Sequence, residues 1–187
     1  MLNLKNRLSQ RVQSVPPSGI RRFFEIAATM EEVITLGIGE PDFVSPEPIM
    51  RGARESMERG LTGYTSNAGI APLREAISEE VDRLYGVKYD PASEVLVTVG
   101  VSEALQLAML ALLDPGDEIL IPEPCFVSYG PAAIFAGATV KYVPTSVEHN
   151  FQVTAADIEA RITDRTKMLF LAYPSNPTGA VLSREKL

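Results

Sequence analysis

Strand-like and helix-like segments alternate from residue 94 to residue 172, and few folds accommodate such an alternation. Short runs rich in apolar and β-branched residues predict strands, and longer amphipathic patterns predict helices. The predicted strands are 94–99, 117–121, 139–143 and 167–172, and the helices between them are 102–113, 127–136 and 154–162. Alternating strands and helices predict parallel strands joined by crossovers, and therefore a three-layer α/β/α fold.

Two further helices are predicted upstream of these strands, at residues 48–59 and 71–85. Gly60 is well placed to end the first helix. Pro72 falls in the first turn of the second, where a missing N–H costs nothing, and Gly86 is expected to stop it. The first 45 residues look like an arm and a connecting segment, so the α/β body is expected at 46–187.

Composition excludes several classes of protein. The 187 residues are 45% hydrophobic and 22% charged, which is ordinary for a globular chain. The net charge of −7 argues against a nucleic-acid or anionic-membrane partner. No apolar run approaches the roughly 18–20 residues of a membrane span, and the polar start is unlike a secretory signal, so the expected location is the cytoplasm. A single cysteine excludes an internal disulfide, and one histidine with one cysteine argues against structural zinc.

The sequence Ser-Asn-Pro-Thr-Gly at 175–179 follows the apolar run 168–172. Asn176 is therefore expected at the carboxyl end of a strand, the edge at which open α/β sheets bind ligands. Its amide can donate a hydrogen bond to a ring oxygen of a cofactor. An ordinary strand-ending turn uses the same residue types, and this alternative stays open.

A second candidate site is the junction between the strand 94–99 and the helix that follows it. Gly100 allows a tight turn, and the backbone N–H groups of Val101 and Ser102 then lie at a helix N-terminus with the Ser102 hydroxyl beside them. Such a terminus can bind an anion. The alternative is that Ser102 only caps its helix.

Further along, nothing near Cys125 in sequence would lower its pKa, so it is expected to be a small buried hydrophobe.

Five segments, together with the opening residues 17–24, resemble fold-type I aminotransferases that depend on pyridoxal phosphate. The likeness is greatest to the aspartate and aromatic amino-acid aminotransferases of archaea and bacteria, and it extends over nearly the whole chain. It implies an arm and small-domain segment at 1–45 and the first, incomplete part of the cofactor-binding large domain at 46–187. The segments are Ile38–Phe43, Tyr64–Gly69, Thr98–Leu105, Pro124–Tyr129 and Ser175–Gly179.

The resemblance implies how this chain would hold the cofactor. Val101 and Ser102 would hold its phosphate, Val101 through its backbone N–H alone, because relatives often carry a small residue there. Phe126 would stack on the pyridine ring, with a core phenylalanine as the alternative. Asn176 would contact the phenolic oxygen. Aspartate-specific relatives commonly have tryptophan at the position of Phe126, so phenylalanine favours an aromatic or broad amino-donor range.

The resemblance also implies contacts with substrate and with a second subunit. Gly39 would contact the α-carboxylate of the substrate, and Asn176 would bind substrate as well as cofactor. Tyr64 would reach the cofactor phosphate of the neighbouring subunit in a homodimer, with a buried core tyrosine as the alternative. The implied reaction moves an amino group from an aromatic amino acid or aspartate to a 2-oxo acid such as 2-oxoglutarate.

Aminotransfer requires a lysine that forms a Schiff base with the cofactor. Relatives have this lysine further along, so the resemblance implies a catalytic lysine beyond Leu187, and we expect this chain alone to be inactive. Two other interpretations stay open, namely a lyase or synthase of the same fold, and a short non-catalytic binding module. The five lysines are Lys5, Lys88, Lys141, Lys167 and Lys186.

Overall fold

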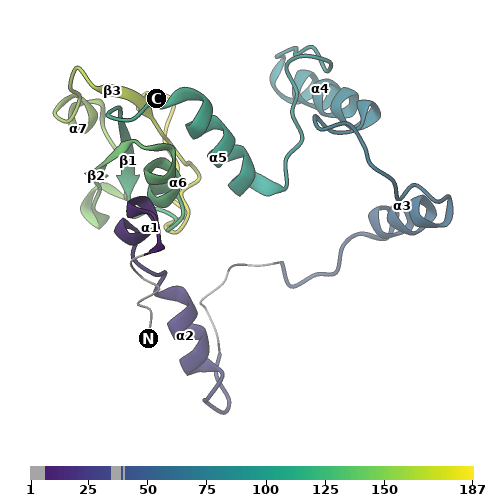
Figure 1. The fold of residues 1–187 in the computed structure, drawn as a ribbon, viewed down its shortest axis with the longest axis horizontal. Coiled ribbons are helices and arrows are strands. Elements are labelled where there is room, and N and C mark those ends of the chain that lie inside the picture. Colours follow the sequence, from purple (N-terminus) through teal and green to yellow (C-terminus); the bar gives the residue numbers. More distant parts are fainter. Residues whose placement is uncertain (1–6, 35–38, 40) are drawn as a thin grey trace. The chain divides into compact units, whose positions relative to one another are not determined.

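The chain divides into two compact units in the computed structural model, which describes residues 7–34, 39 and 41–187. The described residues up to Ser18 belong with Val99–Leu187 in the first unit, and Gly19–Thr98 form the second. The boundary expected between residues 45 and 46 falls inside the second unit and stays a prediction. Figure 1 labels the elements of both units.

A three-stranded parallel sheet forms the centre of the first unit, with strand order β2-β1-β3. Both outer strands pair in parallel with β1, from Glu118 opposite Thr139 on one side to Leu120 opposite Leu169 on the other. The parallel crossovers predicted from the sequence are therefore confirmed. The strands are β1 (Glu118–Glu123), β2 (Thr139–Pro144) and β3 (Thr166–Leu169).

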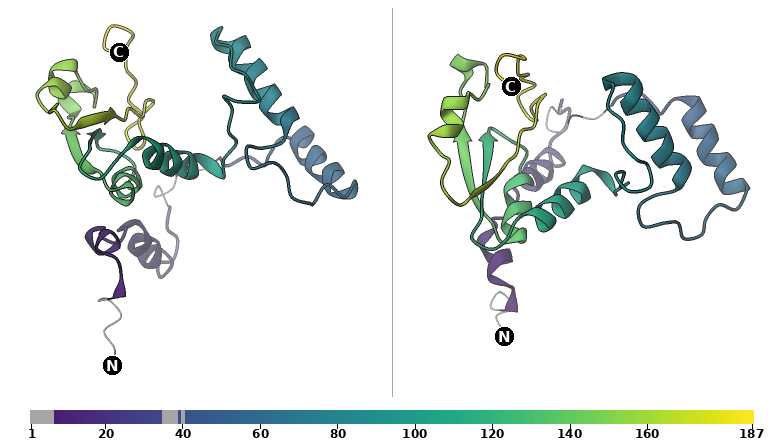
Figure 2. Two further views of the ribbon diagram at one scale, coloured as in Figure 1. Left: turned by 45° about the horizontal axis from the view of Figure 1, so that its top comes forward. Right: turned by 90° about the horizontal axis from the view of Figure 1, so that it is seen from above.

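Helices cover both faces of this sheet. Because successive side chains of a strand point to opposite faces, β1 contributes to two cores. Ile119 and Ile121 pack with residues of α5 and α6, whereas Leu120 packs on the other face with Val143 and Val153 and with Ile158 of α7. Figure 2 shows the sheet from two further directions, with α7 on one side and α6 on the other. The helices are α5 (Gly100–Leu112), α6 (Tyr129–Ala136) and α7 (Ala155–Glu159).

Burial differs between the central strand and its neighbours. Ile119 and Leu120 of β1 are fully buried, but in and after β3 Leu169 and Leu171 remain 41% and 37% exposed. The prediction of a strand over 167–172 is wrong in extent, because the strand ends at Leu169. Its positions alternate between half-buried and exposed because successive side chains point to opposite faces of the sheet.

The strand predicted at 94–99 is not formed within the described part of the chain. The Val97 N–H donates to the Ala68 carbonyl at 3.0 Å, but no ladder joins this segment to another strand among the described residues. Apolar and β-branched residues favour a strand only where a partner strand offers its backbone groups. The sequence of 94–99 indicates this propensity, but it does not show whether a partner strand is present.

The second unit is helical, and the two helices predicted for it are confirmed. Gly86 ends α4 with a left-handed φ of +68°, and a proline lies in its first turn. The apolar side chains of α4 are only partly covered, since Leu73 and Leu84 are 42% and 51% exposed. The helices of this unit are α2 (Ile20–Ala27), α3 (Glu47–Glu58) and α4 (Ala71–Tyr85).

Two short helices complete the first unit. Helix α1 (Gln10–Ser14) is tied to α6, because the Arg11 guanidinium donates to the Phe135 carbonyl at 2.9 Å. The 3₁₀ turn η2 (Val147–His149) follows β2, and His149 is exposed there. Of the helices in the described residues, none has the length and apolar content needed to span a membrane.

A buried carboxylate joins the three strands at their amino-terminal ends. The fully buried Glu118 lies 2.8 Å from Lys141 Nζ and 2.8 Å from Arg165 Nη2, and it accepts a hydrogen bond from Thr163 Oγ1 at 2.6 Å. The hydrogen bond from Lys141, followed by that from Thr163, lowers the pKa of Glu118 below its usual value of 4.5. The members of this cluster are far apart in the chain, so no short motif in the sequence predicts it.

We expect the Glu118→Gln substitution to lower the melting temperature of the full-length protein at pH 7, because two cations then face a neutral amide. The folded pKa of Glu118 is depressed, so its contribution to stability is fully present above about pH 4.5. That contribution is lost as the pH falls from there through the folded pKa. Melting curves between pH 7 and pH 3 should therefore converge for the wild type and the variant.

Glu159→Gln is the matched control, because Glu159 is an exposed carboxylate of the same unit. It should leave the pH dependence of the melting temperature as in the wild type. Parallel curves for wild type and Glu118→Gln across the whole pH range would contradict the role assigned to Glu118.

Candidate functional site

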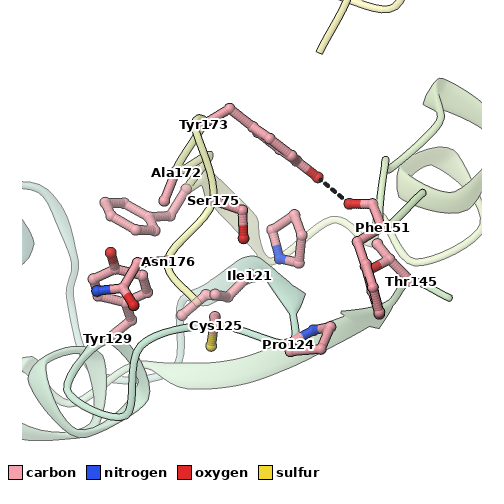
Figure 3. A pocket seen from close by; sticks show the side chains of 12 residues that line it. Ile121, Pro124, Cys125, Tyr129, Thr145, Phe151, Ala172, Tyr173, Ser175 and Asn176 are labelled. Atoms are coloured by element: carbon pink, nitrogen blue, oxygen red, sulfur yellow. Dashed lines mark hydrogen bonds between the residues drawn. The ribbon is translucent and has the colours of Figure 1, made fainter. Parts of the chain in front are cut away.

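A pocket opens at the carboxyl ends of β1 and β3, the edge at which parallel α/β sheets bind ligands. Its walls come from the end of β1 and the turn after it, from α6, from the chain after β2 and from the chain after β3. The lining residues are Ile121, Pro122, Pro124, Cys125, Tyr129, Thr145, Phe151, Phe170, Ala172, Tyr173, Ser175 and Asn176. Figure 3 shows these side chains gathered around the opening. Because β3 ends at Leu169, Asn176 lies in the turn that follows this strand and not at the strand's own end, and it lines the pocket.

The turn that carries Asn176 is closed by its own backbone. The Ser175 N–H donates to the Ala180 carbonyl at 2.7 Å, and the Gly179 N–H donates to the Ser175 carbonyl at 2.8 Å. Asn176 itself is exposed at the rim of the pocket. The segment is thus a strand-ending turn and a pocket wall at once, so the two interpretations of this motif do not exclude each other.

Three aromatic rings lie edge to face beside the pocket. The centroids of Tyr129 and Phe170 are 4.7 Å apart at 61°, and those of Phe126 and Tyr129 are 5.7 Å apart at 72°. Tyr129 is 9% exposed, and Phe126 is half-buried against the same core. Tyr129 was not predicted as a pocket residue, although it ends the motif Pro124–Tyr129. The aromatic content of that motif was the available signal.

Cys125 lines the pocket with its thiol protonated at neutral pH. Burial, and secondly the negative charge of Glu123, raise the pKa of this thiol above its usual value. Burial likewise raises the pKa of Tyr129. Cys125 packs against the core cluster, so its predicted character as a small hydrophobe is confirmed. The pocket therefore offers aromatic surface and neutral polar groups.

The amino terminus of α5 begins two residues earlier than predicted. Gly100 makes the turn with φ +73°, and Val99 is the N-cap residue, without a side-chain cap. Ser102 thus lies inside the first turn, and the alternative that it caps the helix is wrong. Val101 and Ser102 are exposed, and N–H groups of a first turn have no acceptor within their helix. Among the described residues, no hydrogen bond links these two residues to the pocket wall.

The other two candidate residues belong to the second unit. Gly39 and Tyr64 are both exposed. The Tyr64 side chain is fully exposed, so the alternative of a core tyrosine is wrong. Their roles toward substrate and partner subunit stay predictions. Ile38 and Glu40, which belong to the same motif as Gly39, lie outside the described residues.

Known proteins resemble this chain over nearly all of its length. Residues 31–187 match the family model for aminotransferases of class I and II. A putative aminotransferase of Bacillus subtilis is 48% identical over 180 residues, which cover 96% of this chain and 47% of that protein. Aromatic-amino-acid aminotransferase 2 of Thermococcus litoralis is 42% identical, with 96% of this chain and 46% of that protein covered. The chain thus spans about half the length of the curated relatives that it matches.

Solved structures agree with the sequence comparison. An aspartate aminotransferase from Thermotoga maritima superposes with a TM-score of 0.91 at 38% identity, over 95% of this chain and 48% of that one. An aromatic aminotransferase from Pyrococcus horikoshii gives a TM-score of 0.81 at 41% identity, over 89% of this chain and 44% of that one. The α/β fold predicted from the alternating segments is therefore confirmed as part of the fold-type I aminotransferase domain. The chain belongs to the class I and II aminotransferase family.

Proposed function

We propose that this chain forms the amino-terminal, cofactor-holding part of a pyridoxal-phosphate-dependent aminotransferase. The reaction moves an amino group from an aromatic amino acid or aspartate to a 2-oxo acid such as 2-oxoglutarate. The observation that carries the proposal is the pocket at the carboxyl ends of β1 and β3, with Asn176 at its rim, in a chain of this family. The intact enzyme would be a cytoplasmic homodimer.

The chemistry of the site fits the cofactor. Pyridoxal phosphate has a planar ring, a phenolic oxygen on that ring and a phosphate. The site offers aromatic side chains at Phe126 and Tyr129, an exposed amide at Asn176 and an exposed helix amino terminus at Val101 and Ser102. The pocket walls bring aromatic and amide groups together, and a helix amino terminus favours an anion.

Each of these groups would act on a different part of the cofactor. The Asn176 amide donates to the phenolic oxygen and fixes the orientation of the ring. The backbone N–H groups of Val101 and Ser102, with the Ser102 hydroxyl, hold the phosphate. Phe126 stacks on the ring, which contributes about 0.5–1.5 kcal/mol beyond burial. When bound, the cofactor supplies the electron sink for the reaction.

Every lysine among the described residues has a polar partner. A lysine that attacks the cofactor must lose its proton, and Asp117 raises the pKa of Lys167 by its hydrogen bond. These pairings support our proposal that the Schiff-base lysine belongs to a segment beyond Leu187. The pairs are Lys88 with Asp82, Lys141 with Glu118, Lys167 with Asp117 and Lys186 with Gln152.

We also propose roles for the two residues of the second unit. Gly39 contacts the α-carboxylate of the substrate, and Tyr64 reaches the cofactor phosphate of the partner subunit in the homodimer. The complete exposure of the Tyr64 side chain supports this proposal, because a side chain that reaches another subunit must leave its own core. Both active sites would then depend on dimer formation.

The test uses the full-length protein loaded with pyridoxal phosphate and reduced with borohydride, which fixes a Schiff base covalently. Intact mass and peptide mapping should show one adduct, on a lysine outside residues 1–187. The same protein, unreduced, should form glutamate from 2-oxoglutarate when an aromatic amino acid or aspartate is supplied. Comparing the two donors gives the donor preference.

Three results would contradict the proposal. An adduct on one of the five lysines of this chain would show that the catalytic lysine does not lie beyond Leu187. Cofactor binding with a product other than glutamate would indicate a lyase or synthase of the same fold. An absence of cofactor binding would favour the non-catalytic binding module.

A further inference from the structure

The chain that enters the turn carrying Asn176 is held by the hydroxyl of Tyr173. Tyr173 Oη accepts a hydrogen bond from the Val153 N–H at 3.2 Å and donates to the Phe151 carbonyl at 3.1 Å. Figure 3 shows the second of these bonds as a dashed line from Tyr173 to Phe151. One hydroxyl thus uses its donor and an acceptor lone pair to join two distant segments.

The chain that leaves this turn is held by Gln152, which lies between Phe151 and Val153. Gln152 Nε2 donates to the Val181 carbonyl at 2.7 Å, directly after Ala180, which closes the turn. Lys186 Nζ donates to Gln152 Oε1 and so fixes the orientation of this amide. Residues 151–153 therefore contact the chain on both sides of Asn176.

The holding segment is itself firmly anchored to the sheet. Val153 is 2% exposed and packs with Leu120 and Val143. The next residue, Thr154, begins α7 with a capping box, in which it accepts from the Asp157 N–H and the Asp157 carboxylate accepts from the Thr154 N–H. The segment is thus fixed by the core on one side and by a capped helix on the other.

The bonds inside the turn and the bonds to residues 151–153 do different things. Those within 175–180 set the shape of the turn, but they do not place it relative to the sheet. The bonds of Tyr173 and Gln152 join the turn to a segment anchored on the sheet. The strength of a hydrogen bond falls steeply with distance and misalignment, so the placement of the Asn176 amide decides how well it can donate.

We propose that Tyr173 and Gln152 are positioning residues that hold the Asn176 amide where it meets the ring oxygen of the cofactor. This inference rests on the proposed function, because it takes Asn176 as the donor to that oxygen. The effect of both residues on the cofactor passes through Asn176. Tyr173 also lines the pocket, but its hydroxyl is bound to Val153 and Phe151.

The test compares Tyr173→Phe and Gln152→Met in the full-length protein, since each removes the polar contact and keeps most of the side-chain volume. The affinity for pyridoxal phosphate should fall roughly threefold to tenfold in each, the size of one lost neutral hydrogen bond. The pH midpoint of the visible absorption of the bound cofactor should shift in the same direction as in Asn176→Ala. Tyr85→Phe, on the exposed end of α4, is the matched control and should leave both quantities unchanged.

A double-mutant cycle separates positioning from general stabilisation. Tyr173→Phe combined with Asn176→Ala should bind the cofactor no more weakly than Asn176→Ala alone, because the amide to be positioned is gone. Additive losses of cofactor affinity in the double mutant would overturn the inference while the proposed function stands. Wild-type affinity and a wild-type pH midpoint in both Tyr173→Phe and Gln152→Met would overturn it in the same way. If the wild type itself did not bind pyridoxal phosphate, the proposed function would fail first, and this inference with it.

Discussion

Replacing Gly69 with alanine is expected to lower the free energy of unfolding of the full-length protein by roughly 2–5 kcal/mol. Gly69 has φ +96°, a backbone conformation that disfavours any side chain. A Cβ added there would lie 2.6 Å from Val97 Cγ2 and 2.7 Å from Val97 Cβ. Val97 is branched at Cβ, so it cannot rotate away, and the backbone of one segment would have to move.

Denaturant unfolding of Gly69→Ala measures this effect directly. Gly63→Ala is the matched control, because Gly63 belongs to the same unit and an added Cβ meets no atom within 4 Å. It should shift the unfolding free energy by no more than about 0.5 kcal/mol, as surface substitutions usually do. Equal midpoints for Gly69→Ala and the wild type would show that Val97 does not pack on Gly69 in solution.

The Asn176→Ala substitution is expected to weaken the binding of pyridoxal phosphate by roughly 1.5–3 kcal/mol, which is about tenfold to 150-fold in affinity. The lost hydrogen bond is the one proposed from the side-chain amide to the phenolic oxygen, and bonds to charged groups are the stronger ones. Titration of the full-length protein with the cofactor gives the dissociation constant, and the pH dependence of the visible absorption reports on the ring oxygen.

Gln10→Ala is the control for this substitution, since it removes an exposed amide of the same unit from helix α1. It should leave the dissociation constant unchanged. Wild-type affinity in Asn176→Ala would mean that the rim amide does not reach the cofactor, and the proposed orientation of the ring would have to be abandoned.

The sequence was sufficient to predict those features of the fold that depend only on residues close together in the chain. The bounds of α4 follow from a proline in its first turn and Gly86 after its last, because both residues act through their own backbone. The parallel order of β1, β2 and β3 follows from alternating periodicities. By contrast, residues 94–99 have the composition of a strand without forming one, because a strand also requires a neighbour.

The candidate site was predictable to the extent that it lies in short motifs. Asn176 and Phe126 belong to such motifs, and the structure brings Asn176 into a pocket and Phe126 beside it. Tyr173 and Gln152 were missed, since their partners are separated from them by 20 and 29 residues. The tyrosine three residues before Asn176 was the available signal, because a tyrosine hydroxyl that becomes buried requires a partner.

The two ends of strand β1 serve different purposes. Glu118 stands at its amino end among cations, whereas Pro122 and the residues that follow line the pocket at its other end. Six residues of extended chain separate these ends by roughly 16 Å, and the strand between them is buried. Mutations at such a separation have nearly additive effects. Tolerance to acid and the choice of ligand can therefore evolve, or be engineered, by separate substitutions on one strand.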